Sequence, residues 1–272
     1  RSMKRSPKSW ETERQTLKPM SRNILLRLAY DGTDFCGYQV QAKGERTVQG
    51  VLESALEAMH GRKVTSYAAG RTDSGVHADA QYVNFRTNLE TIPPEKFFLA
   101  LNQHLPADLK AQSSREVPED FHARYSALSR SYRYFTLVSP TPVPKYRNYA
   151  HRVPEMPEVE RLQREAQTLV GSHDFTSFAA AGQATETHVR QVTAARFTWE
   201  PPFVVFSITA NGFLWRMVRS IVGTLLERER GRSRGEPGLP ELSALLEARD
   251  RTRAGATAPP QGLFLTNVEY NV

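Results

Sequence analysis

Cysteine is nearly absent from this chain of 272 residues, because Cys36 is its only one. An internal disulfide is therefore excluded, and a reducing compartment, the cytoplasm, is the expected location. The single cysteine and the seven histidines show no CxxC or HxxxH spacing, so we predict no metal site. No run approaches the roughly 20 apolar residues that cross a bilayer, and we expect no membrane partner.

Two signatures of phosphate and dinucleotide binding are also missing. The sequence contains neither a GxxxxGK phosphate loop nor a GxGxxG turn after a strand. Nucleotide hydrolysis and hydride transfer therefore lack their usual sequence support, and we predict no cofactor.

Positive charge is in excess along the chain. Lys and Arg number 36 against 29 Asp and Glu, and the net charge of +7 favours a polyanionic partner. Residues 1–20 are polar and basic, while Glu11 and Glu13 within them count against a transit peptide. We expect a flexible basic extension there, or a true start at Met20.

Apolar periodicity predicts a chain that mixes strands and helices. Alternation with a period of two predicts strands over 23–30, 80–87, 131–138, 189–199, 203–210 and 263–270. A period near 3.6 and proline at starts predict helices over 48–60, 94–105, 157–170, 213–228 and 239–249. Residues 231–238 are expected to form a charged loop, and the fold class is α+β.

The nonapeptide GRTDSGVHA at 70–78 is the most informative stretch. If it is extended, Arg71 and Asp73 leave the same face, and the arginine can hold the carboxylate ionised. Gly75 permits a bend that a Cβ would forbid. The alternative is that Asp73 only closes an Asx turn.

Two further segments place cations beside apolar or aromatic groups. Arg219 falls at the margin of the apolar face of helix 213–228, where it needs a carboxylate partner unless its guanidinium reaches water. Arg130, Tyr132 and Tyr134 share one face of a strand, which suits an unstacked base and its phosphate. Cross-strand packing is the alternative for the tyrosines.

The nonapeptide resembles the signature of the TruA family of tRNA pseudouridine synthases, normally GRTDAGVHA, from which only Ser74 departs. Tyr38 stands where that family more often has tryptophan. Further resemblances follow in family order over 22–272: YDGTDFCGYQVQ at 30–41, ALNQHLP at 100–106, DFHARYSALSRSYRY at 120–134, HDFTSF at 173–178, NGFLWRMVRSIVGTLLE at 211–227 and GLFL at 262–265.

The resemblance implies an architecture that composition does not show. It implies two similar lobes, each a mainly antiparallel sheet covered by helices, with the active-site cleft between them. The lobes are expected at 21–115, with the catalytic aspartate loop, and at 116–272, after the flexible residues 1–20. Their join is expected near 107–125.

The resemblance also implies a function. A cytoplasmic homodimer would isomerise uridine to pseudouridine at positions 38–40 of the tRNA anticodon stem-loop, without cofactor or metal. The catalytic residue would be Asp73, supported by Arg71, Tyr132, Arg219 and Leu263, and RNA would contact Arg124, Arg130, Arg133 and Arg216. The alternatives are a non-catalytic tRNA-binding or folding factor, and a related synthase acting on another RNA position.

Overall fold

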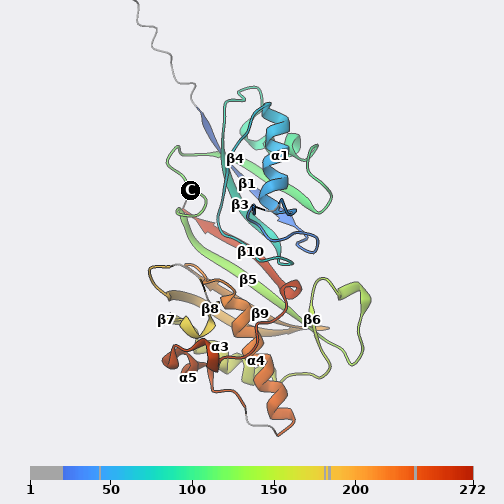
Figure 1. Cartoon of the computed structure of the whole chain (residues 1–272), viewed down its shortest axis with the longest axis vertical. Coiled ribbons are helices and arrows are strands. Elements are labelled where there is room, and N and C mark those ends of the chain that lie inside the picture. The colour runs from blue at the N-terminus through green and yellow to red at the C-terminus, as the bar shows by residue number, and fades with distance from the viewer. Residues whose placement is uncertain (1–20, 43, 181, 183–184, 236–237, 272) are drawn as a thin grey trace, which may run out of the picture.

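The computed structural model describes residues 21–271 except 43, 181, 183–184 and 236–237. The predicted extension at 1–20 lies outside these residues. The described chain is α+β, as predicted, and ten of its strands form one mainly antiparallel sheet in the order β4-β1-β3-β10-β5-β9-β8-β7, with β2 on β3 and β6 on β5 (Figure 1). No helix in these residues is long and apolar enough to cross a membrane.

All six expected strands are present, and further strands were not expected. The bounds predicted at 203–210 and 263–270 match the structure. The strand β4 was not predicted, because its central residues are polar. The strands are β1 (Arg22–Tyr30), β2 (Ser66–Ala68), β3 (His77–Thr87), β4 (Leu109–Val117), β5 (Ala127–Val138), β6 (His151–Val153), β7 (Gly171–Asp174), β8 (Val189–Glu200), β9 (Phe203–Ala210) and β10 (Leu263–Tyr270).

Helices cover both halves of the sheet, with α1 over the β1–β3–β4 half and α3, α4 and α5 beside the β5–β8–β9 half (Figure 1). The α-helices are α1 (Val48–His60), α2 (Phe97–Leu101), α3 (Val159–Gln167), α4 (Met217–Ser233) and α5 (Leu242–Ala248). Short 3-10 turns span Pro94–Lys96, Pro144–Tyr146, Thr176–Phe178, Arg251–Arg253 and Pro260–Gly262.

The strand β10 joins the two halves. It runs parallel to β3 over two pairs, Phe264 with His77 and Leu265 with Ala78, and antiparallel to β5 along its other edge. Each half has its own apolar core, and Tyr132 of β5 packs against both. The two expected lobes are therefore halves of one continuous sheet, and their boundary stays a prediction.

Helix α4 differs from its prediction at both ends. It begins at Met217 instead of 213, because Arg216 has a φ of 61° and interrupts the helical path. It then continues to Ser233, so the loop expected at 231–238 was wrong for its first three residues. A GxSxG pattern at 231–235 thus lies at a helix end, not in the strand-to-helix turn of a nucleophile elbow.

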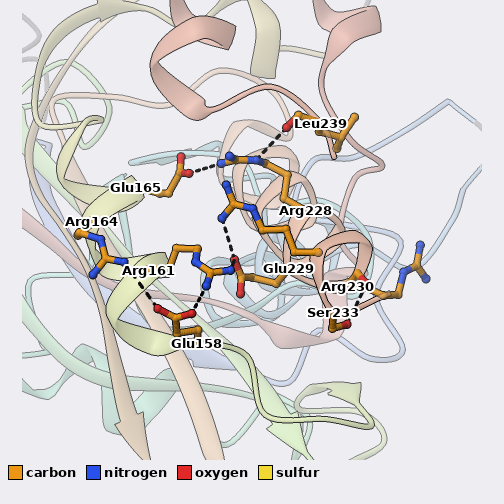
Figure 2. Close-up of polar contacts among 10 residues, drawn as sticks. Glu158, Arg161, Arg164, Glu165, Arg228, Glu229, Arg230, Ser233 and Leu239 are labelled. Atoms are coloured by element: carbon orange, nitrogen blue, oxygen red, sulfur yellow. Dashed lines mark hydrogen bonds and ion pairs between the residues drawn. The ribbon is translucent and has the colours of Figure 1, made fainter. Parts of the chain in front are cut away.

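A buried ion pair between Arg228 and Glu165 holds the C-terminal part of α4 against its neighbours (Figure 2). The Arg228 side chain is only 3% exposed, pairs with Glu165 of α3 and donates to the Leu239 carbonyl at 3.0 Å. Glu165 also accepts from the backbone N–H of Leu242, the first residue of α5, at 3.1 Å. Glu165 therefore ties three helices together.

Candidate active site

The loop between β2 and β3 carries Asp73 on a tight turn. The Val76 N–H donates to the Asp73 carbonyl at 3.1 Å, and Gly75 has a φ of 77° that disfavours any side chain. Val76 itself is buried in the core of the C-terminal half. The loop is thus anchored across the join between the two halves.

A second segment, residues 32–38, braces the same loop. The Tyr38 N–H donates to the Thr72 carbonyl at 3.0 Å, and the Ser74 hydroxyl donates to the Phe35 carbonyl at 3.1 Å. A Cβ at Gly37, whose φ is 89°, would stand 3.1 Å from the Thr72 carbonyl oxygen. Ser74, the one departure from the family signature, therefore contributes a hydrogen bond that alanine lacks.

His77 closes the signature as a structural group. Its Nδ1 accepts from the Gly32 N–H at 3.0 Å, and its Nε2 lies 2.8 Å from the Asn148 carbonyl, to which it donates. The ring is buried and stacks on Phe264 of β10 at 4.5 Å. Burial lowers the pKa of His77, against the opposing influence of Asp31, so the ring is held neutral.

The Asp73 carboxylate receives a donor at each oxygen. Arg219 of α4 donates to Oδ2 at 2.6 Å, and the Trp215 indole donates to Oδ1 at 2.9 Å. The side chains of Arg219 and Asp73 are only 11% and 19% exposed. The Nε of Arg219 also donates to the Ala258 carbonyl at 2.8 Å, which fixes the plane of the guanidinium.

Arg219 has the carboxylate partner expected for it, which is Asp73. The cation expected beside Asp73 was Arg71, and the structure places Arg219 there instead. Arg71 is exposed, and in the described part of the chain no ion pair joins it to Asp73. The loop bends at this point, so the two side chains do not form the pair that an extended segment would allow. Arg71 is instead available to a ligand.

Tyr132 lies on β5 with its ring edge-on to Phe213 at 5.1 Å. Burial raises the pKa of Tyr132, with the Arg130 charge opposing this rise and the Asp73 charge adding to it. The phenol therefore stays neutral and keeps a proton to donate. Tyr134, two residues on, is fully buried and donates to the Pro259 carbonyl at 2.9 Å, so for this tyrosine the packing alternative holds.

Leu263 begins β10 and is buried in the core of the C-terminal half, where its backbone pairs with Tyr134. Phe175 and Phe178 of the HDFTSF stretch are fully buried in the same core, where they pack.

The four arginines predicted to contact RNA are placed differently from one another. Arg124 and Arg216 are exposed, with their guanidinium groups 5.6 Å and 4.7 Å from the ring centres of Tyr125 and Trp215. Both are positioned to meet a ligand, and RNA contact by them stays a prediction.

The guanidinium groups of Arg130 and Arg133 already have protein partners. Arg130 donates to four backbone carbonyls, those of Ala69, Arg124, Ala127 and Asn211, at 2.6 to 3.3 Å. Arg133 points to the other face of β5 from Tyr132, where it pairs with Glu200 at 2.6 Å. RNA contact by these two is untested, and because both guanidinium groups are already paired, we expect a structural role for each, with Arg130 holding the start of the Asp73 loop through the Ala69 carbonyl.

Trp215 is the site residue that sequence reasoning missed. A helix over 213–228 places it within a regular turn, where it is one of several apolar side chains. The left-handed conformation of Arg216 instead sets Trp215 just ahead of the helix, with its N–H on Asp73. No period of the sequence encodes that backbone turn.

The fold and the site define an α+β protein with one aspartate held between a cation and an indole, beside exposed arginines and a half-buried tyrosine. The sequence pattern of the family described as tRNA pseudouridine synthase matches residues 28–126 and 166–271. A tRNA pseudouridine synthase A of Halalkalibacterium halodurans is 47% identical over 244 residues, covering 89% of this chain and 90% of that protein.

Two further relatives agree with these matches. A tRNA pseudouridine synthase A of Treponema denticola is 42% identical over 254 residues, covering 92% of this chain and 93% of that protein. One of Caldicellulosiruptor bescii is 41% identical over 249 residues and is covered in full. The chain belongs to the tRNA pseudouridine synthase family, whose members are isomerases that act on uridine in tRNA.

Proposed function

We propose that this protein isomerises uridine to pseudouridine in the anticodon stem-loop of tRNA, at positions 38 to 40, and that Asp73 starts the reaction. The observation that carries this proposal is the Asp73 carboxylate, held by Arg219 and Trp215 in a loop with the family signature. Preorganised groups of this kind are typical of sites where bonds are made and broken.

The reaction breaks the bond between N1 of the base and C1′ of the ribose and forms a bond between C5 and C1′. The proton on C5 is lost and N1 gains one, so the product is an isomer and no redox carrier is required. Asp73 would begin it by attack on the ribose, by attack on C6 of the base, or by removal of the 2′ proton to give a glycal.

The surroundings of Asp73 suit a base taken out of its stack. Such a base costs a few kcal/mol to extrude and is usually held against an aromatic ring. Tyr132 offers a ring beside Asp73, and its neutral phenol is suited to relay a proton at C5. Leu263 would wall the uridine pocket, and the exposed Arg71 would help displace the base or hold the flanking phosphate.

Aromatic rings and cations near the loop suit the rest of the RNA. Tyr67 of β2, His122 and Tyr125 form a ladder with ring centres 5.1 Å and 4.5 Å apart, and Arg124 lies over Tyr125. Tyr67 and Tyr125 are 43% and 76% exposed, so bases of an opened strand have faces to stack on.

A homodimer in which two subunits hold one tRNA is part of this proposal. A tRNA is much larger than the surface around one Asp73, so a second subunit would extend the basic surface. Light scattering coupled to gel filtration, with and without tRNA, tests the assembly directly. A monomer that turns over at full rate would contradict it.

The decisive test is tritium release from unmodified tRNA carrying uridine labelled at C5. The parent should release tritium, Asp73→Asn should not while still binding tRNA, and the exposed Asp120→Asn should behave as the parent. Mapping of the product should give positions 38 to 40. Binding without release would indicate a tRNA-binding factor, and release mapped elsewhere would indicate a synthase for another RNA position.

A further inference from the structure

Trp215 combines exposure with a contact to the reacting carboxylate. Trp215 is 44% exposed, although tryptophan is highly buried on average in proteins. Its N–H nevertheless donates to Asp73 Oδ1 at 2.9 Å. Because Arg219 holds only the other oxygen, Oδ2, the indole is the contact that determines how the carboxylate is turned.

The backbone around Trp215 is built to keep the indole in this place. The Ala180 N–H donates to the Trp215 carbonyl at 3.0 Å, and the Met217 N–H donates to the Leu214 carbonyl at 3.1 Å. Arg216 between them has a φ of 61°, a backbone conformation that residues other than glycine rarely adopt. Strain of this kind concentrates at functional sites.

The ring of Trp215 is also held on one face. The Arg216 guanidinium lies 4.7 Å from the centre of the Trp215 ring, in a cation–π arrangement. The indole is therefore fixed by its backbone, by one ring face and by its N–H. Because Trp215 is fixed in these ways, it can orient the Asp73 side chain.

We propose that Trp215 is a positioning residue for the isomerisation, which fixes the rotamer of Asp73 through a hydrogen bond to Oδ1. With Arg219 on Oδ2, this bond orients both oxygens before the nucleotide enters. The inference deepens the proposed function and rests on it for its kinetic part only. The geometric part concerns the protein without RNA.

The kinetic experiment compares Trp215→Phe, which keeps a ring but loses the N–H, with Trp215→His, which restores a ring N–H. Removing a hydrogen bond to a charged group predicts roughly a 10-fold to 100-fold lower kcat for Trp215→Phe, with KM nearly unchanged. Trp215→His should recover part of that loss. Trp199→Phe is the matched control, because Trp199 is 43% exposed and lies away on β8.

The structural experiment uses nuclear magnetic resonance of protein labelled with ¹⁵N-tryptophan. Only three tryptophans exist, so three indole signals are expected, and Trp215→Phe assigns one of them. Hydrogen bonding should slow solvent exchange of the Trp215 indole proton relative to that of Trp199, whose exposure is almost the same. Asp73→Ala should remove the difference.

Each result decides the proposal. Slow exchange lost with Asp73→Ala, together with the kcat loss, supports it. Exchange as fast as that of Trp199 overturns it, and so does normal turnover by Trp215→Phe. If the parent itself releases no tritium, the proposed function fails, while the exchange measurement still decides whether Trp215 orients Asp73.

Discussion

Arg219 and Asp73 are separated by 146 residues in sequence, and their side chains meet at 2.6 Å. Asp73 belongs to the loop ahead of β3 in one half of the sheet, whereas Arg219 belongs to α4 on the other half. The contact therefore exists only when the two halves are correctly joined. Activity is expected to report the integrity of this join.

Arg219→Lys should reduce turnover more than its conserved charge suggests. Lysine is a point charge and cannot hold Asp73 and the Ala258 carbonyl with one rigid fork. We expect kcat to fall about 10-fold or more, by tritium release. Arg230→Lys, at an exposed position of the same helix, is the control. Near-normal turnover by Arg219→Lys would show that the fork is not required.

Arg228→Met should destabilise the fold without touching the site. It leaves Glu165 buried without its cation, and breaking one partner of a buried pair costs about 3 to 5 kcal/mol in the free energy of unfolding. Urea unfolding measures this cost. Arg164→Met is the control, because that side chain is 68% exposed and should change stability by less than about 1 kcal/mol.

Arg130→Met separates a clamp from an RNA contact. Four carbonyls lose their donor, and we expect about 2 to 4 kcal/mol less stability together with lower kcat. The salt dependence of tRNA binding should stay as in the parent. A shallower dependence with unchanged unfolding would instead assign Arg130 to RNA, as its sequence predicted.

Arg124→Ala and Arg133→Ala should differ in their effect on tRNA binding. Losing one phosphate contact lowers the slope of log Kd against log salt concentration by about 0.7 to 1. Exposed Arg124 should show this change. Arg133, paired with Glu200 on the other face of β5, should not. Filter binding across a salt series measures both, and equal slopes for the two variants would refute the distinction.

Stability should fall as the solution becomes acidic below neutrality. The folded pKa of His77 lies below its ordinary value, chiefly through burial, so the unfolded chain binds the proton first. In that window the unfolded state holds more protons, and the free energy of unfolding rises with pH. Urea unfolding between pH 5 and 8 measures the slope. His77→Gln should be less stable and flatter in this range, and an unchanged slope would remove His77 from the explanation.

Local sequence patterns were enough to predict much of the fold. Helix 48–60 was predicted at its exact bounds from its apolar face, and in the structure Thr47 caps it by accepting from the Gly50 N–H and Gly61 ends it with a φ of 65°. Strand 263–270 also matched. The start of β3 moved because of a non-local contact, since β10 pairs with it at His77.

The site was predictable only where the chemistry of a single residue requires a particular kind of partner. A carboxylate partner was predicted for Arg219 from the cost of an unpaired charge together with the resemblance to the family, because its place on the helix equally allowed a guanidinium in water. Trp215 has no such requirement, because its contact with Asp73 follows from the backbone turn at Arg216. The carbonyl contacts of Arg130 were equally hidden, because they join segments whose meeting no local pattern encodes.

The position of β10 also sets an order of events during synthesis. Residues 263–270 follow every other strand in the sequence, yet they form the strip between β3 and β5. A growing chain that has reached residue 262 still has two open strand edges facing each other, and such edges invite wrong partners. We therefore expect the aspartate of one half to meet the arginine of the other only after this short segment has left the ribosome.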